Sequence, residues 1–194
     1  MNTPFQTETI EHCGITVQIE YFYDDTMRAP WKECDGHGVI REAYGKPDKK
    51  PGEVLISGGR GQYWIYDFQE STKIAKRDKW GVHNAPAGLT QNQITAMAVQ
   101  RDFEYCKGWI QNAWHYAGVV CTVLDKHGEK IPNVEESCWG FETLDDYHET
   151  AGKEMAQALA ESEHDRRLNQ WRASLKECRA RKYWASRDVE TIGA

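Results

Sequence analysis

Apolar and polar positions alternate most regularly in residues 15–23. The apolar members are Ile15, Val17, Ile19 and Tyr21, and the residues between them are mostly polar. A period of two is typical of a β-strand with one buried face. The pattern therefore predicts a strand over residues 15–23. Residues 1–12 are polar without a clear period, so we expect them to form a loosely held arm.

Two β-hairpins are indicated further along the chain. In the first, apolar residues 54–56 and the run 62–68 flank a glycine-rich turn at 58–61. No Lys-Ser/Thr pair follows these glycines, so the segment is interpreted as a hairpin and not as a phosphate-binding loop. In the second, residues 118–125 are expected to pair with residues 136–142 across a turn. A short strand is also expected at 39–44.

Helix starts are marked by residue pairs that cap a first turn. Asp67 with Glu70 predicts a helix over residues 69–80, and Thr90 with Gln93 predicts one from 91 to about 115. A third pair, Thr143 with Asp146, predicts a helix that ends near residue 164, and the tail then forms another. In the helix 91–115 we expect the following residues to form the buried stripe: Ile94, Ala98, Arg101, Tyr105 and Trp109.

Together these elements predict an α+β fold. It has an antiparallel sheet of two or more hairpins packed by a long central helix, with a C-terminal helical appendage. We expect residues 15–23 and 118–125 to share a sheet that is covered by the helix 91–115. The predicted domains are an α+β body at residues 1–164 and a basic amphipathic helical tail at 165–194.

Charge is unevenly distributed between these two parts. The chain has a net charge of −6, yet residues 165–194 hold eight Lys/Arg against four Asp/Glu, which leaves an acidic body and a basic tail. With Trp171, Tyr183 and Trp184 interleaved, the tail is a candidate surface for nucleic acid. We favour the alternative, in which its Leu/Trp side packs on the acidic body. The basic candidates are Arg166, Arg167, Arg172, Lys176 and Arg179.

The spacing of the cysteines and the hydropathy of the chain argue against several classes of protein. The six cysteines form no Cys-x-x-Cys pair, so we expect reduced thiols and not a zinc ribbon or a disulfide framework. No run of eighteen apolar residues and no signal-like N-terminus are present, so we expect neither a membrane span nor secretion.

The greatest density of reactive side chains lies in residues 24–38. Asp24, Asp25, Asp35 and His37 carry oxygen and imidazole ligands suited to a divalent metal, which would activate water for hydrolysis. The alternative, which we favour, is a structured turn at residues 35–38 in which Asp35 caps its own backbone and His37 donates to a backbone carbonyl. Trp31 completes the candidate functional loop as a surface on which a nucleotide would stack.

Cys34 lies three residues before His37, which raises the hypothesis of a nucleophile with its base. Residues three apart on a loop need not touch. A buried or merely solvated thiol is the preferred interpretation.

Several runs resemble a group of small proteins encoded by tailed bacteriophages and prophages, over roughly residues 15–160. This group often has Gly in place of Arg28 and His in place of Cys34, which argues against Cys34 as an indispensable nucleophile. The runs that carry the resemblance are Tyr23-Asp24-Asp25-Thr26-Met27-Arg28-Ala29-Pro30-Trp31, Asp35-Gly36-His37-Gly38, Tyr66-Asp67-Phe68, Ala75-Lys76-Arg77-Asp78-Lys79-Trp80-Gly81 and Cys138-Trp139-Gly140-Phe141-Glu142.

The resemblance implies an accessory protein that acts in the host cytoplasm. We expect it to bind and inhibit or modulate a host protein or ribonucleoprotein complex, such as a CRISPR effector or a nuclease, with no cofactor. Two alternatives stay open. One is a hydrolase of nucleic acid or nucleotide that uses a divalent metal at Asp24, Asp25, Asp35 and His37, and the other is a nucleotide-sequestering protein.

Overall fold

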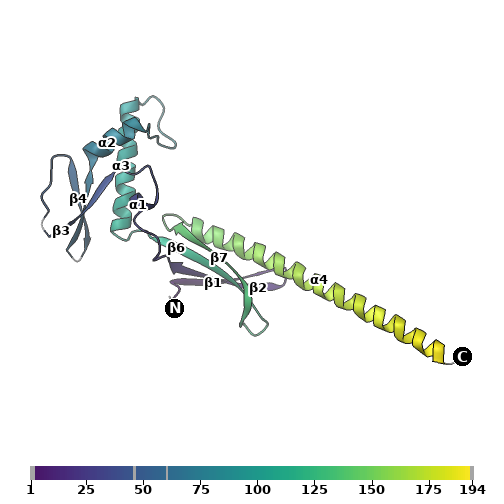
Figure 1. Ribbon diagram of the computed structural model, residues 1–194. Coiled ribbons are helices and arrows are strands. Elements are labelled where there is room, and N and C mark those ends of the chain that lie inside the picture. The colour runs from purple at the N-terminus through teal and green to yellow at the C-terminus, as the bar shows by residue number, and fades with distance from the viewer. Residues whose placement is uncertain (1–2, 46, 60, 193–194) are drawn as a thin grey trace. The chain divides into compact units, whose positions relative to one another are not determined.

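The computed structural model describes residues 3–45, 47–59 and 61–192, with side chains described as far as Arg181. The fold is α+β with two antiparallel sheets (Figure 1), as the sequence predicts. The chain forms two compact units. Unit 1 is Met1–Tyr23, Ala117–Phe141 and Asp146–Ala194, and unit 2 is Asp24–Tyr116 and Glu142–Asp145. Unit 2 is thus inserted within the sequence of unit 1.

Unit 1 contains a four-stranded sheet in the order β1-β2-β6-β7. Its strands are β1 (Gln6–His12), β2 (Ile15–Tyr23), β6 (Tyr116–Leu124) and β7 (Lys130–Glu142). Strand β2 pairs antiparallel with β6, with Tyr23 opposite Ala117, which confirms that these two predicted strands share a sheet.

Strand β1 corrects the expectation of a loosely held arm at residues 1–12. It pairs antiparallel with β2 along its whole length, from Gln6 opposite Tyr21 to His12 opposite Ile15. Its residues alternate between partly buried and exposed, and Ile10 packs against the core of unit 1. The alternation was missed because Gln, Thr and Glu occupy most positions of an edge strand that has only one half-covered face.

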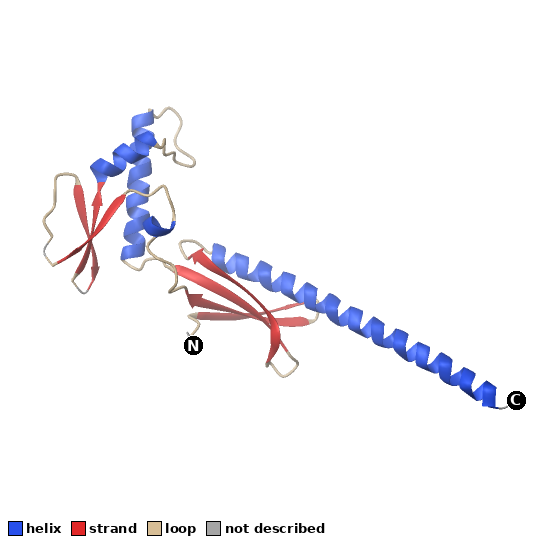
Figure 2. Ribbon diagram, viewed as in Figure 1, coloured by secondary structure: helices blue, strands red, loops and turns tan. Residues whose placement is uncertain are grey.

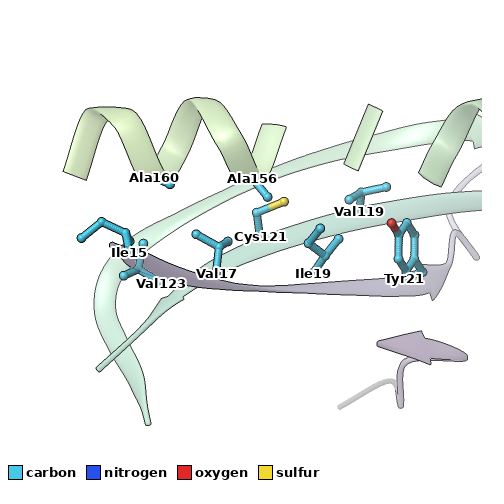
Figure 3. Close-up of a cluster of buried hydrophobic side chains, with 9 residues drawn as sticks. All are labelled: Ile15, Val17, Ile19, Tyr21, Val119, Cys121, Val123, Ala156 and Ala160. Carbon is cyan, nitrogen blue, oxygen red and sulfur yellow. The ribbon is translucent and has the colours of Figure 1, made fainter. Parts of the chain in front are cut away.

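The core of unit 1 lies between this sheet and helix α4 (Tyr147–Ile192) (Figure 3). The inward residues of β2 and β6 meet Ala156 and Ala160 of α4. At Gly152 an added Cβ would crowd the Tyr21 hydroxyl, the side chain of Val119 and that of Ile19. Small residues on this face therefore let the helix approach the sheet closely. The buried residues are Ile15, Val17, Ile19, Tyr21, Val119, Cys121, Val123, Ala156 and Ala160.

Helix α4 is 46 residues long and continuous (Figure 2), whereas the sequence suggested two helices meeting near residue 164. The residues Glu163, His164 and Asp165 do not interrupt it, since all three are compatible with helical geometry. The predicted start at Thr143 is also wrong, because the Thr143 hydroxyl bonds to the backbone of His115 and the helix begins at Tyr147. From His164 to Arg181 every side chain except Leu168 is exposed.

Unit 2 contains a three-stranded sheet in the order β3-β5-β4. Its strands are β3 (Val39–Tyr44), β4 (Glu53–Gly59) and β5 (Gln62–Asp67), and the expected hairpin is formed by β4 and β5. The hairpin turn includes Arg60, which lies outside the described residues. The helices are α1 (Pro30–Glu33), α2 (Phe68–Arg77) and α3 (Gln91–Ile110). Asp67 caps α2, and Thr90 with Gln93 forms the predicted capping box of α3.

Helix α3 packs within unit 2, against α2 and β4, and not on the sheet of β2 and β6 as expected. That sheet is covered instead by α4. The buried face of α3 also differs from the predicted stripe, since Arg101 is exposed and Ile94, Tyr105 and Trp109 are only partly buried. The buried residues of α3 are Thr95, Ala98, Val99, Phe103, Cys106 and Ile110.

Candidate functional site

The side chain of Asp102 on α3 is the centre of a buried polar network in unit 2. Its carboxylate is 8% exposed and accepts hydrogen bonds at both oxygens. Oδ1 lies 2.7 Å from Nδ1 of His37, while Oδ2 accepts from the Gly38 backbone N–H at 2.8 Å and from the Tyr66 hydroxyl at 2.6 Å. The Cys106 thiol, one helical turn further on, lies 3.6 Å from Oδ1 and 3.8 Å from His37 Nδ1.

Two glycines bring the loop of residues 35–38 to this carboxylate. Gly36 has a φ of +94°, in the left-handed region that glycine adopts without strain. A Cβ at Gly38 would overlap with the hydroxyl groups of Ser71 and Tyr66. The next residue, Val39, donates its backbone N–H to Ser71 Oγ at 2.9 Å. The Asp-Gly-His-Gly run is therefore a tight turn fixed against α2, α3 and β5. Its contacts differ from those expected of the turn, because His37 bonds to the Asp102 carboxylate and not to a backbone carbonyl. The backbone cap by Asp35 stays a prediction.

The network holds Tyr66 and Cys106 in their neutral forms. Burial raises the pKa of the Tyr66 hydroxyl, and the hydrogen bond to Asp102 raises it further. Burial likewise raises the pKa of the Cys106 thiol, with an added contribution from the charge of Asp102. His37 is 17% exposed and its ring stacks on that of Tyr105, 5.4 Å between centroids and 15° between planes. Its orientation is therefore fixed from two sides.

His37 also borders an open pocket of about 430 Å³. Arg77 and Asp78, at the end of α2, form an ion pair of 2.7 Å on its rim. The lining is mostly polar and includes three of the five residues of the predicted functional loop. The lining residues are Trp31, Cys34, Asp35, Gly36, His37, Ile74, Arg77 and Asp78.

The four residues proposed as a metal-binding set have different surroundings in the structure. Asp24 is buried, and its Oδ1 accepts from the backbone N–H and the hydroxyl of Thr26, which closes a local turn. Asp25 and Asp35 are exposed, and Asp35 lines the pocket together with His37. His37 bonds to Asp102, which lies 65 residues away in the sequence, and not to another residue of the loop.

Trp31 contributes to the core more than to a free stacking surface. Its ring makes edge contacts with those of Trp64 and Trp109, at 5.1 and 5.3 Å between centroids. It is partly buried against the core of unit 2, although one part of it lines the pocket. Cys34 is exposed on the same pocket, whereas the thiol adjacent to His37 belongs to Cys106.

His37, Asp102 and Cys106 bring three potential metal-ligand atoms close together. One ligand atom from each lies within 4.8 Å of the others, and this is the one such group in the part of the chain that the structure describes. Of the three, only His37 belongs to the functional loop predicted from the sequence. Asp102 and Cys106 were missed because they lie on α3, four residues apart and far from the loop in sequence.

The basic tail residues divide into two groups. Arg166 and Arg167 both bind the carboxylate of Glu163, each at 2.6 Å, and the Glu163 side chain is only 1% exposed. Arg172, Lys176 and Arg179 are exposed further along α4. The favoured packing of the Leu/Trp side of the tail on the body is not seen, because Trp171 and Leu175 are exposed. The side chains of Tyr183 and Trp184, which belonged to the alternative nucleic-acid surface, lie outside the described residues.

Comparisons of the chain with protein-family models, with curated proteins and with solved structures found no match. Among the described residues, no helix has the length and apolar character needed to cross a membrane. The function is therefore argued from the geometry of the chain itself.

Proposed function

We propose that this protein is a bacteriophage accessory protein that binds a host complex and inhibits or modulates it, with α4 as the docking element. The observation that carries the proposal is the second half of α4, which leaves its sheet and exposes an apolar stripe. Trp171 is 59% exposed and Leu175 is 36% exposed. The resemblance to phage-encoded proteins is the reason for expecting a partner from the host.

The stripe has the spacing of a helix that binds another helix. Leu168, Trp171, Leu175 and Cys178 follow one another at intervals of three, four and three residues. This is the repeat by which one helix places its apolar side chains between those of a second helix or in a groove. An exposed Trp at the centre of such a stripe is the kind of residue that dominates binding energy.

The basic residues beside the stripe indicate the charge of the partner. Arg172, Lys176 and Arg179 lie at intervals of four and three residues, along one edge of the stripe. Arg166 and Arg167 share the single carboxylate of Glu163, which offsets one of their two charges, so they contribute less to this edge. We therefore expect an acidic, partly apolar helix of a host protein as the surface on which α4 docks. The acidic residues 1–164 would then compete for a basic nucleic-acid site of the same complex.

A site-specific cross-link tests this assignment. A photoreactive residue is placed at Ser174, which is exposed beside the stripe, and the full-length chain is irradiated in lysate of a host cell. We expect one protein to be cross-linked, and the Trp171→Ala/Leu175→Ala variant to lose it. The matched control is Asn169→Ala/Gln170→Ala, on the opposite side of the helix, which should retain the cross-link.

Three outcomes would contradict the proposal. A cross-link that survives in the stripe variant would show that the stripe is not the docking surface. Loss of the product on nuclease treatment would show that the tail binds nucleic acid. Cross-linking to a second copy of this chain, with a matching dimer in light scattering, would make the stripe a self-association surface.

The hydrolase alternative has weaker support. It requires Asp24, Asp25 and Asp35 beside His37, but Asp24 closes its own turn and none of the three belongs to the metal-capable group. The nucleotide-sequestering alternative relies on Trp31, whose ring is engaged with Trp64 and Trp109.

A further inference from the structure

We infer that His37, Asp102 and Cys106 form a binding site for a zinc ion, through Nδ1, Oδ1 and Sγ respectively. This site is independent of the docking element in α4, because all three residues lie in unit 2. It also differs from the set expected from the sequence, with which it shares only His37.

Two of the three separations between these atoms are close to those of a tetrahedral zinc site. Ligands bound at about 2.0–2.3 Å from the ion lie roughly 3.3–3.6 Å from one another. Sγ of Cys106 is 3.6 Å from Asp102 Oδ1 and 3.8 Å from His37 Nδ1. The remaining pair, Nδ1 and Oδ1, is a hydrogen bond of 2.7 Å and would open by about 0.6 Å around an ion.

The carboxylate of Asp102 is already oriented as a ligand that binds through one oxygen. Oδ2 is occupied by the Gly38 backbone N–H and the Tyr66 hydroxyl, so these two donors fix the plane of the group. Oδ1 faces the imidazole and the thiol. Hydrogen bonds that orient ligands in this way are a regular feature of protein metal sites. Stacking of His37 on Tyr105 fixes the second ligand.

The chemistry of the three ligands selects the ion. A thiolate with an imidazole and one carboxylate suits Zn²⁺ or Co²⁺, whereas Mg²⁺ prefers oxygen ligands. His37 is the member that borders the open pocket, so an ion and a fourth ligand from water reach the site from that side. On binding, the thiol proton of Cys106 passes to solvent, and the His37 ring carries its proton on Nε2.

A bound ion would join the loop of residues 35–38 to α3 more firmly than the hydrogen bonds do. The loop lines the pocket, and so the ion would also fix the wall formed by Asp35, Gly36 and His37. The site is therefore expected to act on the stability of unit 2, whether or not α4 has a partner.

Cobalt spectroscopy of the reduced full-length chain tests the inference. The background is a variant in which the four exposed cysteines are replaced by serine, so that only Cys106 and Cys121 remain as thiols. We expect one equivalent of Co²⁺ to give the visible bands of a tetrahedral site and a thiolate charge-transfer band, and Zn²⁺ to displace it. The replaced residues are Cys13, Cys34, Cys138 and Cys178.

Cys106→Ser and Cys121→Ser are a matched pair, because both thiols are buried and only the first belongs to the group. Cys106→Ser should abolish the charge-transfer band and Cys121→Ser should leave it unchanged. His37→Ala repeats the test at a partly exposed position, where folding is less at risk.

A thermal melt gives a second measurement. A hundredfold excess of Zn²⁺ over its dissociation constant should raise the melting temperature by about 5–10 °C, reversed by a chelator and absent in His37→Ala. Mg²⁺ should have no such effect. The inference is wrong if the background variant gives no tetrahedral cobalt spectrum, or if the charge-transfer band survives in Cys106→Ser.

Discussion

The two units each pack a helix against a sheet over an apolar core, and in unit 2 a polar network lies beside that core. In unit 1 the interface of α4 with β2 and β6 is apolar, and its buried thiol, Cys121, lies among Val, Ile and Ala side chains. Burial raises the pKa of Cys121 to about 12. In unit 2 the buried thiol, Cys106, lies beside a carboxylate and an imidazole.

Apolar burial and the polar network have different roles in this chain. Apolar burial stabilises roughly in proportion to area and has no preferred direction. A buried carboxylate with several donors holds specific atoms at specific distances and is costly to disturb. The apolar core of unit 1 therefore holds the first half of a long helix, whereas the network in unit 2 fixes His37 at the edge of a pocket.

The largest expected effect comes from Asp102→Ala in unit 2. The change leaves the donors of His37, Gly38 and Tyr66 without their acceptor, so we expect the free energy of unfolding to fall by about 3–5 kcal/mol. Urea unfolding in the presence of a chelator, followed by tryptophan fluorescence, measures it.

The control for this variant is Asp125→Ala in unit 1. The Asp125 carboxylate accepts the backbone N–H groups of His127 and Glu129 in an exposed turn, and its loss should cost only about 1 kcal/mol. Equal losses in the two variants would mean that the Asp102 network is no more important to its unit than an ordinary turn.

An intermediate effect is expected from Ala156→Leu in unit 1. The side chain at this position is fully buried between α4 and the sheet, so the larger residue should cost about 1–3 kcal/mol through overpacking. Ala173→Leu, on the exposed half of the same helix, should stay within about 0.5 kcal/mol of the parent chain. If Ala156→Leu is tolerated equally well, the close approach of α4 to the sheet is incorrect.

The smallest effect is expected from shortening α4. A chain ending at Arg167 should keep nearly its full stability, whereas one ending at His164 should lose about 1–2 kcal/mol more, because the buried Glu163 carboxylate loses both arginines. Urea unfolding of the two truncated chains at neutral pH gives this difference.

The difference in stability between the two truncated chains should decrease as the pH falls. The hydrogen bond from Arg166, followed by that from Arg167, lowers the pKa of Glu163 in the folded chain. A carboxyl group with a lowered pKa stabilises the fold at neutral pH and loses that contribution as the pH falls through its folded value. The two truncated chains should therefore converge in acid, and a constant difference would contradict the role of the ion pairs.

Local signals in the sequence predicted most of the elements. The caps at Asp67 and Thr90 placed the starts of α2 and α3. Alternation predicted β2, an apolar run predicted β6, and the two share a sheet as expected. Strand β1 was missed because an edge strand of Gln, Thr and Glu has no apolar period to detect. The sequence was interpreted as two helices meeting near residue 164 because of the charged residues there. A single helix accommodates these residues without difficulty.

The face of α3 shows why the site was harder to predict. The expected stripe and the face that carries Asp102 have the same spacing of four, three, four and four residues, displaced by one position. Periodicity alone does not show which of the two stripes is buried. The stripe with Tyr105 and Trp109 has the more apolar residues, so it was the one predicted. The pairing of His37 with Asp102 depends on the packing of unit 2, which no local pattern contains. The residues of the second stripe are Thr95, Val99, Asp102, Cys106 and Ile110.

The insertion of unit 2 between β2 and β6 imposes an order on folding. Tyr23 and Ala117 are opposite one another in the sheet, although the whole segment Asp24–Tyr116 separates them in sequence. Closing so long a loop before any of it is ordered is entropically costly and slow. If unit 2 folds first, the hydrogen bond from the Asp24 backbone N–H to the Tyr116 carbonyl already brings the ends of the loop together, and the two strands meet as neighbours. The inserted unit would then act as the nucleus for the sheet that surrounds it in sequence.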